Sequence, residues 1–302
     1  MLALPRHSDG VQVTLPELIA RAEHQGLIRS HHTNNAKALQ AGERLSRLKG
    51  RGMEFAEVRA YQYGDDVRSI DWRVTARTGK AHTKLFRDER EQPVLLCVDL
   101  GSRMQLGSKL VLQAVQAAHL AATIGWHVSN QGDRLGGIIV NETDHSELKP
   151  RARRGGLLPL LESMVELQPT TEHNNDYWQQ ALERLHRLAR AGSQVVIITN
   201  PLGFDEASMQ QIRRLRQHAQ VRLFCITDPL FEQLAQQRHS LPVRLPNHDS
   251  NSWLDNAGST QLANRWHQAQ QNAERFGRQH QLPITEISAA IPLEQQWQKL
   301  WL

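Results

Sequence analysis

The feature that most constrains the fold is the alternation, from residue 93 onward, of strand-length apolar runs with longer helical segments. The apolar runs lie at 93–100, 134–140, 193–199, 221–227 and 282–287. The helical segments lie at about 107–127, 155–167, 175–191, 204–218 and 258–280. Apolar strands separated by helices are typical of a parallel sheet covered on both faces. A strand at 144–149 follows its predecessor too closely for a crossover helix, so we expect one antiparallel edge strand.

The residues before this α/β pattern divide into two parts. Residues 1–49 carry a helical segment, with Thr14 as a plausible N-cap, followed by a basic, glycine-bounded connection. Residues 50–92 change period: between Phe55 and Tyr61, larger side chains alternate with Ala or Val, which predicts a strand. A second strand is expected from His82 to Glu91. We therefore predict an N-terminal helical segment (1–49), a β-rich arm (50–92) and an α/β domain (93–302).

Composition narrows the class of protein. Of the 302 residues, 39% are hydrophobic and 22% charged, which excludes a disordered chain. No apolar run approaches the roughly 18 residues that a membrane-spanning helix needs. The first ten residues contain no signal-peptide apolar core, and Cys97 and Cys225 lie inside apolar runs as expected of buried free thiols. These features predict a cytoplasmic protein.

The densest group of charged residues lies in the arm, around two strands and a turn. It contains Asp65, Asp66 and Asp71 interleaved with Arg68, Arg73 and Arg77. Guanidinium groups bind carboxylates bidentately, so we expect a network of ion pairs that holds this turn in one shape. The alternative is that the three aspartates form a hard-metal site for phosphoryl chemistry. The neighbouring arginines disfavour that alternative, because they compete for the same oxygens.

The same stretch carries a family resemblance over about 40 residues. It contains an E-x-R-x-Y strand, the string G-D-D-x-R-x-I-D-W, an A-R pair and a Lys-Phe-x-x-E-R stretch. The matching residues are Glu57, Arg59, Tyr61, Gly64, Asp65, Asp66, Arg68, Ile70, Asp71, Trp72, Ala76, Arg77, Lys84, Phe86, Glu89 and Arg90. This pattern closely resembles the signature of the bacterial family catalogued as "domain of unknown function 58".

The resemblance has implications for fold and partners. It implies that the remainder of the chain is a von Willebrand factor A-like domain, in agreement with the independent α/β pattern. It also implies linkage to a MoxR-type AAA+ ATPase and to other von Willebrand A-type proteins, in systems thought to assist maturation or stress tolerance. The signature residues that we expect to serve binding are Glu57, Arg59, Tyr61, Asp65, Asp66, Arg68, Asp71, Trp72 and Arg77.

Metal-binding von Willebrand A domains carry D-x-S-x-S after the first strand, a Thr from a later loop and an Asp after the fourth strand. Here Asp99 is present, but Gly101 and Arg103 occupy the two Ser positions, and Asn200 stands where the second Asp is expected. We therefore predict a degenerate site without metal. We expect the Arg103 guanidinium to pair with Asp99 in the space of the cation, and Asn200 to complete the site as a neutral hydrogen-bonding group.

A second candidate site is the run of Arg151, Arg153 and Arg154 with two glycines before a predicted helix. Backbone amides and arginines at a helix start can hold phosphate, although a solvated loop is the simpler interpretation. The net charge of +5 leaves nucleic-acid binding open without requiring it. No G-x-x-x-x-G-K-[ST] segment occurs, so we expect no nucleotide binding through a P-loop.

Together these patterns predict a non-enzymatic interaction protein without a cofactor, acting as adaptor or substrate-recognition partner of a MoxR-type ATPase. One alternative is a metal-dependent phosphoester hydrolase that uses Asp65, Asp66, Asp71 or Asp99. Another is a nucleic-acid-binding protein that uses Arg151, Arg153 and Arg154. An enzyme requires convergent carboxylates in a pocket, and a nucleic-acid binder requires a continuous basic face. An adaptor requires an exposed patch that a partner buries.

Overall fold

A computed structural model describes residues 4–28, 53–88, 93–167, 176–234, 241–244 and 251–299. The chain forms two compact units, one of residues 1–31 with 92–302 and the other of residues 32–91. Residues 4–28 therefore belong to the α/β unit, whereas the sequence suggested a separate N-terminal segment over residues 1–49.

The α/β unit is built on a six-stranded sheet. Its strands are β3 (Val94–Asp99), β4 (Arg134–Val140), β5 (His145–Ala152), β6 (Gln194–Thr199), β7 (Gln220–Thr227) and β10 (Ile284–Ser288). Their order across the sheet is β10-β7-β6-β3-β4-β5, and all neighbours are parallel except β4 and β5. The predicted α/β class and the antiparallel edge strand are confirmed, and the arrangement is consistent with a von Willebrand factor A-like domain.

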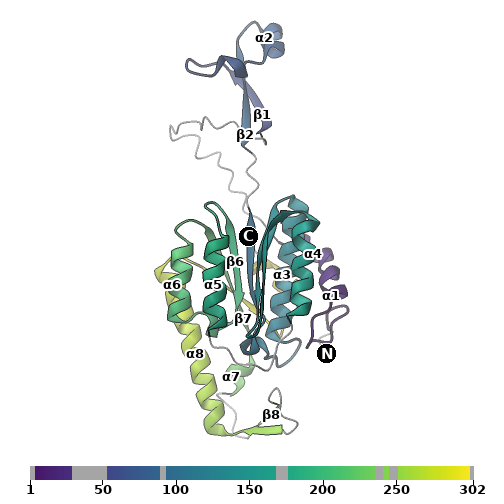
Figure 1. Cartoon of the computed structure of the whole chain (residues 1–302), viewed down its shortest axis with the longest axis vertical. Coiled ribbons are helices and arrows are strands. Elements are labelled where there is room, and N and C mark those ends of the chain that lie inside the picture. Colours follow the sequence, from purple (N-terminus) through teal and green to yellow (C-terminus); the bar gives the residue numbers. More distant parts are fainter. Residues whose placement is uncertain are drawn as a thin grey trace. The chain divides into compact units, whose positions relative to one another are not determined.

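Helices cover both faces of this sheet (Figure 1). One face carries α1 (Leu15–Ala20), α3 (Gln113–Gln131) and α4 (Arg154–Glu166), and the other carries α5 (Tyr177–Leu188), α6 (Glu206–Leu215) and α8 (Asn256–Gln279). The core therefore has two layers. Along β3, Leu96 and Val98 pack into the first layer, while Leu95 and Cys97 pack into the second. Side chains of a strand alternate between faces, so a strand buried on both sides is apolar at every position.

The N-terminal helix is held on α3 by buried polar contacts. Glu17 and His119 are both fully buried, and the His119 Nε2 lies 2.5 Å from the Glu17 Oε1. The Trp126 indole donates to the Leu18 carbonyl oxygen at 3.0 Å, and the buried Arg21 pairs with Glu294. These contacts join segments about a hundred or more residues apart, which explains why α1 forms part of the α/β unit.

Several elements differ from the sequence prediction. Helix α3 begins at Gln113 rather than near residue 107, because the preceding segment is bonded elsewhere: the Ser108 amide donates to Asp228 and the Leu112 amide to the Gly10 carbonyl. After α1 the chain continues as a 3₁₀ helix, η1 (Arg21–Leu27). The other short elements are η4 (Ser102–Met104), η5 (Pro201–Gly203), α7 (Leu230–Leu234), β8 (Leu241–Arg244), β9 (Asn251–Leu254) and η6 (Leu293–Lys299).

The second unit is the β-rich arm. Its strands β1 (Met53–Ala60) and β2 (His82–Asp88) pair antiparallel, with a register shift between Phe55 and Glu57. Between them lie η3 (Val67–Ser69) and α2 (Trp72–Thr78), which the sequence analysis did not predict. Gly79 ends α2 with φ of +70°, a left-handed conformation that favours glycine.

Two compositional predictions concern burial. Cys97 and Cys225 are both buried and free, and burial raises the pKa of each thiol well above its usual value. Among the described residues, no helix combines the length and the apolar character needed to cross a membrane.

Candidate functional site

The candidate site lies where the strand order of the sheet reverses. The chain leaves β3 toward β4 on one side, while β6 lies on the other side of β3. Asp99 ends β3 and Thr199 ends β6, so both residues stand at the carboxyl edge of the sheet. Ligands of open α/β sheets bind in the crevice at this point.

Asp99 is fully buried, and protein groups occupy both of its carboxylate oxygens. Oδ1 accepts hydrogen bonds from the Gly101 amide at 3.0 Å and the Tyr177 hydroxyl at 2.9 Å. Oδ2 accepts from the Arg103 Nε at 2.7 Å and the Thr199 hydroxyl at 2.6 Å. A carboxylate has about four lone-pair positions, so these four donors leave none for another ligand.

Arg103 supplies the positive charge that offsets the buried Asp99. The expected pairing of these two residues is confirmed by the short contact above. The guanidinium carbon also lies 5.0 Å from the centre of the Tyr177 ring and 5.1 Å from that of Trp178, within cation–π range. Burial, the largest single influence, would lower the pKa of Arg103, but the charge and hydrogen bond of Asp99 together with Tyr177 and Asp205 raise that pKa above its usual value. Arg103 therefore stays charged.

Gly101 makes room for Tyr177. A Cβ atom on residue 101 would clash with the Tyr177 hydroxyl, so only glycine at this position lets that hydroxyl reach Asp99. Burial and the charge of Asp99 raise the pKa of Tyr177 far above its usual value, which keeps the hydroxyl protonated as a donor. Where the metal-binding pattern has a serine, this chain therefore has a glycine, and the Tyr177 hydroxyl occupies the space of the missing side chain.

Sequence reasoning missed the two hydroxyl donors, Tyr177 and Thr199. Thr199 carried a weak signal, because it ends the predicted strand beside Asn200. Tyr177 begins α5 and lies 78 positions from Asp99, and no spacing rule connects the two.

Asn200 is a neutral hydrogen-bonding group of the site, as expected, and it acts through Arg103. Its amide nitrogen donates to the Arg103 carbonyl at 2.7 Å and to the Gln113 side chain at 3.0 Å. No hydrogen bond joins Asn200 to Asp99 among the described residues; the residue before it, Thr199, makes that bond. Asn200 instead fixes the loop that carries Arg103 against the start of α3, and so orients the guanidinium indirectly.

A second buried carboxylate lies at the same edge, after β4. Glu142 is 6% exposed, and its Oε1 accepts a hydrogen bond from the Ser102 amide. This contact ties the loop after β4 to the loop after β3. Because Ser102 lies between Gly101 and Arg103, Glu142 helps to hold both residues in place.

Within the described part of the arm, Asp65, Asp66 and Asp71 form no ion pair with Arg68, Arg73 or Arg77, so the predicted network is not formed there. Asp65 pairs with Arg59 at 2.8 Å and accepts a hydrogen bond from the Gln62 amide. The bond from Gln62 and the pairing with Arg59 both lower the pKa of Asp65. Asp66 accepts the Arg68 backbone amide at 2.9 Å, which caps η3. Thus neither aspartate binds the guanidinium groups that the sequence suggested.

Asp71 is the N-cap of α2 and accepts the backbone amides of Arg73 at 3.0 Å and Val74 at 3.1 Å. Its other oxygen lies 3.6 Å from the Lys84 Nζ. The two backbone hydrogen bonds and the charge of Lys84 lower the pKa of Asp71. The predicted network was wrong because the short side chain of an aspartate hydrogen-bonds to nearby backbone amides in preference to the more distant guanidinium groups.

Three groups of signature residues remain. The Tyr61 hydroxyl donates to the Asp65 carbonyl at 3.2 Å and so serves the turn itself. Arg68, Trp72 and Arg77 are exposed. Glu57 lies in β1, but its side chain, like those of Phe86, Glu89 and Arg90, falls outside the part of the chain whose side chains are described.

The predicted anion site is exposed. Arg151 lies in β5, Arg154 begins α4, and Arg153 joins them with a positive φ of 54°. All three side chains are exposed, and the carbonyl of Arg153 accepts the Gly156 amide at 3.1 Å. These features agree with a solvated loop.

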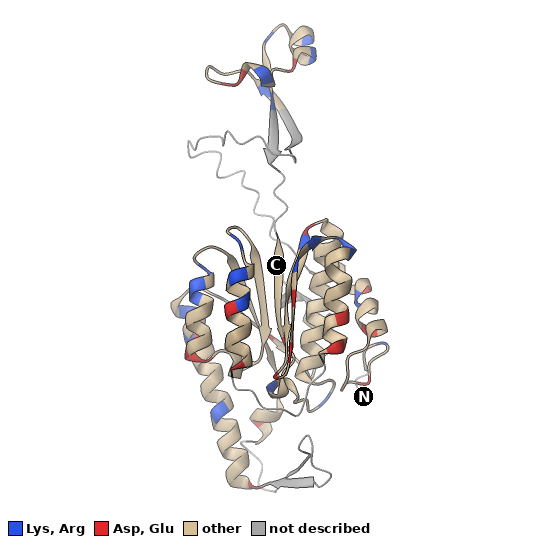
Figure 2. Ribbon diagram, viewed as in Figure 1, with Lys and Arg blue, Asp and Glu red and all other residues tan. Residues whose placement is uncertain are grey.

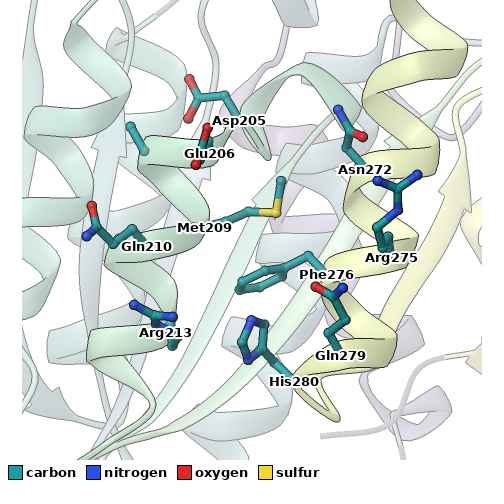
Figure 3. A pocket seen from close by; sticks show the side chains of 11 residues that line it. Asp205, Glu206, Met209, Gln210, Arg213, Asn272, Arg275, Phe276, Gln279 and His280 are labelled. Atoms are coloured by element: carbon teal, nitrogen blue, oxygen red, sulfur yellow. The ribbon is translucent and has the colours of Figure 1, made fainter.

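A groove that the sequence analysis did not anticipate lies between α6 and α8, with a volume of about 830 Å³. Figure 3 shows Met209 and Phe276 between the two helices, with Arg213 on one wall and Arg275 on the other. Asp205 and Glu206 line one end. Among the described residues, no group of three His, Cys, Asp or Glu side chains is placed to hold a metal ion, in this groove or elsewhere.

Comparisons with known proteins agree with the signature. A family model described as "Protein of unknown function DUF58" matches residues 57–275. Uncharacterized proteins of Mycobacterium bovis and of two strains of Mycobacterium tuberculosis are each 30% identical over 188 residues, which is 62% of this chain. The chain spans 59% of the length of these relatives. No solved structure matches the chain.

Proposed function

The chain belongs to the family described as "Protein of unknown function DUF58", and from this membership and the Asp99 geometry we propose that it is a non-enzymatic protein-interaction module. The observation that carries the proposal is the closure of the Asp99 site by the chain's own groups. Four protein donors hold the carboxylate, and one of them, Arg103, carries the neutralising charge.

Closure bears on function because the metal-dependent mode of this fold needs free oxygen ligands. Mg²⁺ demands near-octahedral oxygen coordination at short distances. To bind Asp99, it would have to displace a charged guanidinium and two hydroxyl donors from a fully buried carboxylate. The geometry therefore supports an interaction that does not use a metal bridge.

We infer the partner from the resemblance of the arm's signature to its family. The proposed partner is a MoxR-type AAA+ ATPase, for which this protein acts as an adaptor in a maturation or stress-tolerance system. Its two buried free thiols suit a reducing cytoplasm, where we place this activity.

The alternatives receive less support from the described residues. A phosphoester hydrolase needs carboxylates that converge on a metal, yet Asp65, Asp66 and Asp71 are each engaged by nearby backbone amides. A nucleic-acid binder through Arg151, Arg153 and Arg154 has only an exposed loop in its favour.

Titration calorimetry with MgCl₂ and binding to the purified ATPase test the proposal together. We expect no saturable heat with Mg²⁺, and unchanged ATPase binding after this chain alone has been treated with EDTA and dialysed. A saturable, micromolar heat that disappears in Asp99→Ala would overturn the closed, metal-free Asp99 site on which the proposal rests. Failure of the ATPase to bind the wild-type chain would overturn the assigned partner.

A further inference from the structure

The arm exposes large apolar side chains close together in the sequence. Among the residues whose side chains are described, eight large hydrophobic residues are exposed, and three of them are Tyr63, Val67 and Trp72. Trp72 is 68% exposed and Val67 is 61% exposed. Tryptophan and tyrosine are typical anchors of protein interfaces, where burial of their large rings carries much of the binding energy.

The local structure holds Trp72 in place. Trp72 is the first residue of α2, directly after its N-cap Asp71, and the Asp71 amide donates to the His82 carbonyl at 2.8 Å. Asp66 caps η3, which carries Val67. An anchor presented on a capped turn loses little conformational freedom on binding, because it is already ordered.

Charge defines the kind of partner. Arg68, Arg73 and Arg77 are exposed and lie within five positions of Trp72 in the sequence, and none of the three forms an ion pair with a carboxylate within the described part of the arm. Figure 2 shows in blue the basic residues of α2, which are both arginines. The nearby aspartates are occupied, since Asp65 pairs with Arg59 and Asp71 with Lys84. Three exposed guanidinium groups without an ion pair in the described arm, close in the sequence to an exposed indole, fit an acidic surface.

We propose that Tyr63, Val67, Arg68, Trp72, Arg73 and Arg77 form a docking surface, here called the arm patch, for an acidic protein surface with an apolar recess that receives Trp72. This inference rests on the proposed function and adds the location and chemistry of its interface. A protein fits better than a nucleic acid, because the exposed Asp66 lies within the same stretch and would repel a phosphate backbone. Trp, Tyr and Arg are also the residues enriched in protein interfaces.

The test measures binding of the purified MoxR-type ATPase to the full chain by biolayer interferometry. We expect Trp72→Ala to weaken binding about 30-fold, the scale of a hot-spot residue. The triple variant R68E/R73E/R77E should slow association and remove most of its salt dependence. Matched controls on the α/β unit are Ile291→Ala, which removes an exposed apolar side chain, and Arg213→Glu, which reverses an exposed charge. Both should bind like the wild type.

Amide exchange in β1 and β2 verifies that each arm variant keeps its fold, and the outcomes separate the two proposals. Wild-type affinity in both arm variants would overturn the arm patch and leave the interaction function standing. Absence of binding in the wild type would overturn the assigned partner and the arm patch together. Binding of a fluorescent single-stranded oligonucleotide that the triple variant abolishes would assign the patch to nucleic acid instead.

Discussion

The Asp99 site and the signature arm use the same residue types in opposite ways. In the α/β unit, a fully buried aspartate is paired with an arginine and accepts three further protein donors. In the arm, Asp66 and Asp71 cap short helices, and Arg68, Arg73 and Arg77 are left exposed. The difference follows from access to water: a fully buried carboxylate needs strong compensating partners, whereas an aspartate that still reaches solvent finds enough donors in nearby backbone amides.

The largest effect is expected at Arg103. Arg103→Leu leaves the buried Asp99 without its counter-charge, so the free energy of unfolding should fall by about 3 kcal/mol. Urea unfolding of the α/β unit, followed by tryptophan fluorescence, measures this loss. The double variant Asp99→Asn/Arg103→Leu should recover most of it, because no uncompensated charge remains.

Arg213→Leu is the control for Arg103→Leu, since Arg213 is exposed and should cost less than about 0.5 kcal/mol. Equal losses in the Arg103 single variant and the double variant would contradict the assigned role of the pair.

The buried pair of Glu17 and His119 tests whether burial also controls the protonation of a histidine. Burial lowers the pKa of His119. Burial would raise the pKa of Glu17, but the hydrogen bond with His119 and the other interactions of Glu17 lower it overall. Glu17→Gln should reduce the free energy of unfolding at neutral pH by about 2 kcal/mol, the scale of disturbing a buried charged hydrogen bond.

Both shifts predict the same pH dependence. Because each group has a lower pKa in the folded state, the unfolded chain binds more protons, and stability falls on acidification. The His119 contribution is lost as the pH falls below its ordinary pKa of 6.5, and that of Glu17 below 4.5. In His119→Gln, the urea midpoint should therefore change less than in the wild type as the pH falls from 7 to below 6.5. An unchanged profile would show that His119 is not buried in its neutral form.

A smaller, local effect is expected at Asp71. Asp71→Ala removes the acceptor of the Arg73 and Val74 amides, so these amides should exchange with solvent about fivefold faster, as expected for loss of an N-cap. Asp71→Asn retains a capping oxygen and is the matched control. Loss of the entire arm fold in Asp71→Ala would instead support the ion-pair network that the sequence suggested.

The smallest effects concern the exposed arginines. Arg68→Ala, Arg73→Ala and Arg77→Ala should each change the free energy of unfolding by less than about 0.5 kcal/mol, because none forms an ion pair within the described arm. Urea unfolding and amide exchange in β1 and β2 measure it. A loss above 1 kcal/mol in any of them would remove the contrast between the arm and the Asp99 site.

The parallel sheet of the α/β unit and the helices that cover it were predictable from the sequence alone. The apolar runs mark the parallel strands because a strand buried on both faces must be apolar at every position, a property of local sequence. The same argument placed Asp99 at the end of β3. The motif comparison then identified Arg103 as its expected partner, since a residue four positions on in the same loop lies within reach.

Only the tertiary structure decided which groups complete the site and how the arm is held. Tyr177 and Thr199 reach Asp99 from elements 78 and 100 positions away, and Glu17 meets His119 across 102 positions. In the arm, the choice between a guanidinium and a backbone amide as the partner of an aspartate depends on distances of a few ångströms. Sequence patterns report the period and burial of a segment, but convergence of side chains from separate elements arises only when those elements pack together.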